Sequence, residues 1–60
     1  MVQIRRRDRV RVELPNTPFH KQQGVVWELD LVNKRCLVVF PKRSKLDPDW
    51  FALNEIQKES

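Results

Sequence analysis

Apolar residues recur at every second position in short runs of this chain, and no segment of ten or more residues places them at the spacing of an amphipathic helix. Val10, Val12 and Leu14 alternate with charged neighbours, which is typical of a strand buried on one face. We therefore expect a first strand over residues 7–14. Pro15 follows it and cannot donate a backbone hydrogen bond to a neighbouring strand. The pattern predicts an all-β fold built from short strands.

Further strands are expected beyond Gly24, the only glycine in the chain. A lone glycine in a β-rich sequence usually marks a bulge or a backbone position with positive φ. In the strand that follows it, Val25, Trp27 and Leu29 are expected to share one face. The expected elements are strands over residues 25–29, 35–40, 50–53 and 56–58, a tight turn over 32–35 with Asn33 tolerating left-handed geometry, and a single helical turn over 53–56 before the last strand.

A chain of 60 residues with one cysteine has few ways to stabilise such a fold. Cys36 cannot form an internal disulfide, and no Cys/His cluster exists that could hold a structural metal. Stability then depends on a small apolar core, in which Cys36, Val38 and Phe40 are expected. Short strands in this number favour one SH3-like barrel of about five antiparallel strands over residues 1–60, with 1–6 as a candidate flexible extension, and an OB-fold as the alternative. Such a barrel has no interior room for a ligand, so function is expected on loops and exposed strand faces.

Basic residues outnumber acidic ones by 12 to 8, and the net charge of +4 favours acidic partners. Arginines stand at every second position from residue 5 to residue 11, so in an extended strand they would all project from one side. Only Arg9 and Arg11 are placed firmly on the outer face, because they alternate with the apolar residues of the first strand. The candidate partner-binding residues are Arg5, Arg7, Arg9, Arg11, Lys34, Arg35, Lys42, Arg43 and Lys45. For any one of them, a solvated side chain without a partner is the simpler explanation.

The sequence offers little support for catalysis. His20 is expected to be a solvent-exposed loop residue and Cys36 a small buried hydrophobe, with no third group spaced to orient them. Asp47 and Asp49 flank Pro48, as in a turn. A single glycine excludes a glycine-rich phosphate loop. We expect that the protein is not an enzyme and uses no metal and no cofactor.

The aromatic residues are divided between the core and the surface. Phe40 and at least one of Trp50 and Phe51 are needed in the core of so small a domain. Phe19 lies in a proline-bounded loop and is the aromatic residue most expected to be exposed, with folding over one end of the barrel as an equal alternative. An exposed aromatic ring could stack on nucleic-acid bases.

Several segments carry a resemblance to known families. The segments GVVWELD, CLVVF and above all WFALNEIQ resemble the PsaE family of the photosystem I reaction centre, whose members are small SH3-like barrels. The segment PNTPFHKQQGVV is similar to the NdhS family, which docks ferredoxin on the photosynthetic NADH dehydrogenase-like complex. The resemblance implies a non-enzymatic accessory or docking subunit of a photosynthetic electron-transfer complex. Its basic surface would contact an acidic protein such as ferredoxin, or the host membrane complex. The implied location is cytoplasmic or stromal, peripheral on the thylakoid membrane.

An alternative function comes from a further resemblance. The segment QQGVV is similar to the KOW modules of ribosomal and transcription proteins, which would imply RNA or DNA backbone contacts through the arginine-rich first strand. We expect no transmembrane segment in this chain. The longest uncharged apolar run covers residues 36–40, whereas a spanning helix needs about 20 apolar residues.

Overall fold

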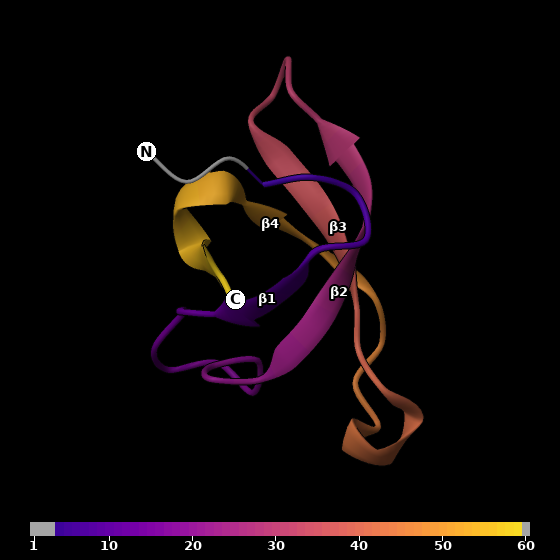
Figure 1. The fold of residues 1–60 in the computed structure, drawn as a ribbon. Coiled ribbons are helices and arrows are strands. Elements are labelled where there is room, and N and C mark those ends of the chain that lie inside the picture. The colour runs from indigo at the N-terminus through magenta and orange to yellow at the C-terminus, as the bar shows by residue number, and fades with distance from the viewer. Residues whose placement is uncertain (1–3, 60) are drawn as a thin grey trace.

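A computed structural model of the protein describes residues 4–59 (Figure 1). Within these residues, five antiparallel strands form one sheet in the order β4-β3-β2-β1-β5, which curls into a compact, barrel-like fold. The strands are β1 (Arg9–Val12), β2 (Gln23–Asp30), β3 (Arg35–Val39), β4 (Asp49–Ala52) and β5 (Ile56–Lys58), and the two single 3-10 turns are η1 (Lys42–Ser44) and η2 (Leu53–Glu55). The all-β class and the helical turn before the last strand are therefore confirmed.

The core is made of side chains that alternate along the strands. Val10 and Val12 of β1 are fully buried, as is Val26 of β2, and Cys36 and Val38 of β3 are buried beside them. Alternation with exposed or half-buried neighbours is what a strand with one buried face requires. The core is completed by Phe40, Phe51 and Ile56, with Ile4, Leu14, Phe19, Leu29, Leu46 and Leu53 packed against it. The expected inward positions of Cys36, Val38 and Phe40 are confirmed.

Three phenylalanines close one end of the barrel. The Phe19 ring lies 5.5 Å from the Phe40 ring and 5.2 Å from the Phe51 ring, measured between centroids. Phe40 and Phe51 meet edge to face at 6.1 Å. Phe19 is half-buried and packs against the core. The expectation of an exposed Phe19 is wrong, and its alternative, folding over one end of the barrel, holds.

Strand β2 contains a bulge that changes which residues face inward. Its pairing with β3 shifts register between Val26 and Glu28. Val26 is buried and Leu29 packs against the same core, although three positions separate them, whereas Trp27 is 47% exposed. A bulge adds one unpaired residue and so reverses the alternation beyond it. Val25 and Trp27 share the outer face as expected, but the expected place of Leu29 on that face is wrong.

Gly24 lies just before this bulge and serves a different purpose from the one expected. Gly24 does not have a positive φ, and the bulge lies further along the strand. A Cβ atom at Gly24 would instead stand 2.6 Å from Cγ1 of Val38 and 2.9 Å from the carbonyl oxygen of Val39. The glycine is needed because β2 and β3 approach too closely for a side chain.

The first strand is shorter than expected. It covers only Arg9–Val12, and residues before it form a turn in which Arg7 has a φ of 75°. The Arg7 N–H donates to the Val26 carbonyl at 2.7 Å, and the Arg5 N–H donates to the Asp8 carboxylate at 2.9 Å. That hydrogen bond from the Arg5 backbone is the main reason why the pKa of Asp8 lies below its usual value. The row of arginines is thus interrupted. Of its members, only Arg9 and Arg11 lie in an extended strand. The expected flexible extension over 1–6 falls partly outside the described residues.

The hairpin between β2 and β3 turns over residues 31–34. Its left-handed residue is Lys34, with a φ of 55°, and not Asn33 as expected. Asn33 instead bonds to the preceding Asp30, whose carboxylate accepts the Asn33 backbone N–H at 3.2 Å and the side-chain N–H at 2.8 Å. Over residues 4–59, none of the helical segments is long and apolar enough to cross a membrane.

A candidate binding groove

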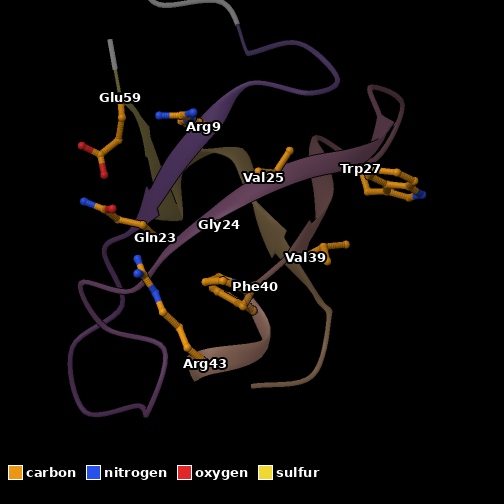
Figure 2. A pocket seen from close by; sticks show the side chains of 10 residues that line it. Arg9, Gln23, Gly24, Val25, Trp27, Val39, Phe40, Arg43 and Glu59 are labelled. Carbon is orange, nitrogen blue, oxygen red and sulfur yellow. The ribbon is translucent and has the colours of Figure 1, made fainter. Parts of the chain in front are cut away.

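An open groove of about 770 Å³ lies over β1, β2 and β3 (Figure 2). Strand register brings its central residues together, because Val25 pairs with Arg9 on β1 and with Val39 on β3. These paired residues lie on the outer face of the sheet, opposite the buried Val10, Val26 and Val38. The groove is lined by Arg9, Gln23, Gly24, Val25, Trp27, Val39, Phe40, Pro41, Arg43 and Glu59.

The floor of the groove is apolar. Val25 and Val39 are half-buried neighbours in the sheet, and Phe40 and Pro41 continue the surface towards η1. Trp27 lies at one end of the groove and Gln23 towards the other (Figure 2). A floor of this kind offers contact area to an aliphatic or aromatic side chain of a partner.

Two arginines stand on opposite sides of this floor. Arg9 extends from β1, and Arg43 reaches up from η1 towards Gln23 (Figure 2). Both are exposed, and within residues 4–59 neither guanidinium takes part in an ion pair. Their hydrogen-bond donors are therefore available to carboxylate or phosphate groups, which guanidinium binds in bidentate fashion.

A third arginine lies at the tryptophan end. The guanidinium carbon of Arg7 stands 4.8 Å from the centroid of the Trp27 ring, a cation–π distance. The positive φ of Arg7 turns the chain so that this side chain comes to lie beside β2. One face of the exposed indole is thus covered by a cation, which extends the basic rim.

Glu59 supplies the carboxylate that lines the groove. Its Oε1 atom is buried and has no hydrogen-bond partner among the described residues, while its backbone N–H donates to the carbonyl of Arg9 at 2.8 Å. A buried carboxylate oxygen without a donor is costly, and a donor group from a bound partner could satisfy it. With Arg9 and Arg43 in the same lining, the groove remains positive overall.

Other basic side chains are neutralised within the molecule. Arg11 is paired to Glu13 at 2.8 Å and also donates to the Gln57 side chain at 2.9 Å. Arg35 is paired to Asp30 at 3.1 Å and lies 4.6 Å from the centroid of the Trp50 ring. Two further pairs join Arg6 to Glu28 at 3.7 Å and Lys58 to Asp8 at 3.4 Å. The formal charge of +4 is therefore spread unevenly over the surface.

The structure brings only some of the predicted site residues together. Arg9 and Arg43 line the groove, Arg7 borders it through Trp27, and Lys42 and Lys45 lie in or next to η1 beside Arg43. Lys34 and Arg35 lie at the other end of β3, near the hairpin turn, Arg11 faces β5, and Arg5 lies in the turn before β1. The predicted basic residues thus form no single surface.

Several groove residues could not be chosen from the sequence. Val25, Val39 and Trp27 are apolar strand residues, and their outward direction depends on the pairing register and the bulge. Gln23 and Glu59 carry no local motif. The outward position of Val25 could have been inferred from its alternation with the buried Val26, once the strand had been divided at the bulge.

His20 has a structural role in the loop after β1, where the sequence predicts an exposed side chain. It is half-buried, and its Nδ1 atom accepts the backbone N–H of Leu14 at 3.1 Å, which fastens the loop after β1. The expectation of a solvent-exposed loop residue is therefore wrong. Within residues 4–59, no group of three or more His, Cys, Asp or Glu side chains is arranged to hold a metal ion.

The thiol of Cys36 is expected to be almost unreactive in the folded protein. Burial raises the pKa of Cys36 to about 11, so its nucleophilic thiolate is scarce at neutral pH. We expect a disulfide reagent to label native protein at least about a hundredfold more slowly than protein unfolded in guanidinium chloride. Thiol release, followed by absorbance, measures both rates. Equal rates would show that β3 opens readily and would contradict the packing described above.

Comparison with known proteins does not assign the chain to a family, because no family model matches the sequence and no curated protein matches it.

Proposed function

We propose that the protein is a non-enzymatic docking module that binds an acidic segment of a partner protein in the groove over β1, β2 and β3. The observation that carries this proposal is the position of Arg9 and Arg43 on opposite sides of an apolar floor, both without an ion pair within residues 4–59. Carboxylates of the partner would meet the two guanidinium groups, and an apolar side chain between them would lie on Val25 and Val39.

The groove suits rapid and reversible binding. Exposed charges on its rim steer an oppositely charged partner and raise the association rate more than the final affinity. The apolar floor is small, so the complex would belong to the class of weak, transient interfaces. Such behaviour is useful where a partner must arrive and leave quickly.

The resemblance of WFALNEIQ and GVVWELD to the PsaE family of the photosystem I reaction centre supports a narrower proposal. In this version the partner is a ferredoxin-like electron carrier with an acidic surface, and the module is an accessory subunit of a photosynthetic electron-transfer complex. It would work on the cytoplasmic or stromal side, held at the thylakoid membrane by its host complex.

Nucleic acid is less well supported as the partner. A surface that binds a phosphate backbone needs several unpaired basic side chains in a line. Here the turn at Arg7 interrupts the arginine row, and Arg11 is paired to Glu13. Arg9 and Arg43 instead flank an apolar floor. That arrangement matches an acidic peptide with an apolar anchor better than it matches a phosphate backbone.

Charge reversal tests the proposal. The double variant Arg9→Glu, Arg43→Glu should bind plant-type ferredoxin with an association rate at least about tenfold lower than the unchanged protein, since steering accounts for about 10- to 1,000-fold in rate. Stopped-flow measurements at low and physiological salt give the rate. The matched control is Lys21→Glu, Lys34→Glu, which also brings the net charge from +4 to 0 but changes no groove residue. Its rate should fall by about threefold or less.

Two outcomes would contradict the proposal. Equal losses in the two double variants would show that only net charge matters and that the groove is not the site. Binding of RNA or duplex DNA at physiological salt, with a steep loss of affinity as salt rises and no binding of ferredoxin, would favour the nucleic-acid function instead.

A further inference from the structure

The tip of the β2–β3 hairpin exposes two consecutive aliphatic side chains. Leu31 is 68% exposed and Val32 is 91% exposed, more than the exposed tryptophans Trp27 and Trp50. The hairpin extends beyond the rest of the barrel, at the top of Figure 1. Side chains as exposed as these gain little from burial within the protein itself, so their burial by a binding partner would be favourable.

The tip is held in place by polar contacts immediately below it. The Asp30 carboxylate accepts hydrogen bonds from Asn33 at 2.8 and 3.2 Å and from the Arg35 guanidinium at 3.1 Å. The Lys34 carbonyl accepts the backbone N–H of Leu53 at 2.9 Å, which ties the turn to η2. The two aliphatic side chains are therefore presented by a fixed turn, and little ordering would be needed when they are buried.

The surroundings of the tip suit an anionic, interfacial environment. Lys34 is exposed and forms no ion pair within residues 4–59. Trp50 is 41% exposed and stacks on Arg35, the first residue of β3 after the turn. Tryptophan and lysine are side chains that lie at the headgroup level of bilayers, and the net charge of +4 attracts acidic lipids.

The arrangement of the two aliphatic residues favours lipid over a protein pocket. Leu31 and Val32 are adjacent and both largely exposed on a protruding turn, so whatever binds the tip must cover two neighbouring aliphatic side chains at once. The hydrocarbon of a bilayer is apolar on all sides and accepts both. We propose that this hairpin tip inserts into the headgroup and outer acyl region of an anionic membrane, with Leu31 and Val32 as the inserted residues and Lys34 at the headgroups. This inference does not depend on the groove or its partner.

The expected binding is weak and reversible, because only two aliphatic side chains are inserted. A basic residue near an anionic surface contributes about fivefold in affinity. Binding should therefore depend on acidic lipid and fall with salt.

Vesicles provide the test. We expect the protein to sediment with vesicles of about 30% phosphatidylglycerol in phosphatidylcholine at low salt, and at least about fivefold less with pure phosphatidylcholine. The variant Leu31→Ser, Val32→Ser should lose at least about tenfold in affinity for the anionic vesicles, and Lys34→Gln about fivefold. In a Trp27→Phe background Trp50 is the remaining tryptophan, and its emission should shift to shorter wavelength on binding.

The serine variant should fold normally, because both replaced side chains are exposed, and its thermal midpoint verifies this. The inference is wrong if the folded serine variant binds anionic vesicles as tightly as the unchanged protein. It is also wrong if the unchanged protein binds no vesicles at low salt, or if the serine substitutions weaken only ferredoxin capture. Loss of ferredoxin binding in the Arg9→Glu, Arg43→Glu variant bears on the groove alone.

Discussion

Replacing Phe51 with alanine should remove most of the protein's free energy of unfolding. Phe51 is 3% exposed and is in contact with the rings of both Phe19 and Phe40. Removing a buried phenylalanine costs about 3–5 kcal/mol, from lost burial and from the cavity that remains. A domain of 60 residues has a total stability of roughly 3–9 kcal/mol, so little of it would remain.

The neighbouring residue is a matched control for this change. Trp50→Ala removes a larger side chain from the same strand, but Trp50 is 41% exposed and its ring stacks on Arg35. Its loss should cost only about 1 kcal/mol. Urea unfolding followed by circular dichroism measures both changes. If the two variants lost equal stability, the inward direction of Phe51 and the outward direction of Trp50 would both be contradicted.

Gly24→Ala is expected to destabilise the protein by about 1–3 kcal/mol, although alanine replaces glycine without strain in most strands. The added Cβ would lie 2.9 Å from the Val39 carbonyl oxygen and 2.6 Å from Cγ1 of Val38. The first contact is with backbone, so the substitution must separate β2 from β3. A more restricted unfolded chain offsets the cost by about 0.4–1 kcal/mol at most.

The exposed neighbour Gln23→Ala serves as the control and should change the free energy of unfolding by less than about 0.5 kcal/mol. Comparison of the two urea midpoints isolates the effect of the close approach. A stabilised Gly24→Ala variant would show that the two strands can separate without loss, and that the glycine serves no packing purpose.

Sequence periodicity was sufficient for the fold class and for the place of most strands. The alternation of Val10 and Val12 with arginines marks β1, and the apolar run before Pro41 marks β3. Both signals are local, so neighbouring residues alone determine them. The single helical turn before the last strand was also predicted, within one residue of η2.

The misassigned features depend on residues far apart in the chain. The bulge at Trp27 is a property of how β2 pairs with β3, and no residue type near it signals the shift. Arg11 is a mixed case, because its ion-pair partner Glu13 is only two positions away, whereas its second partner, Gln57, lies 46 positions away. The groove has the same origin, since Arg9 and Arg43 come together only through the register of three strands.

The bulge also divides β2 into two halves that can change independently. Before it, Val25 and its neighbours form the floor of the groove, and after it the strand leads through Asp30 to the hairpin tip. An insertion or deletion in the hairpin beyond the bulge would alter the length and direction of the tip. It would leave Val25 and its neighbours before the bulge on the outer face. Variants with different hairpins could therefore share one groove, so this short strand can diverge at one end while the other end is held constant.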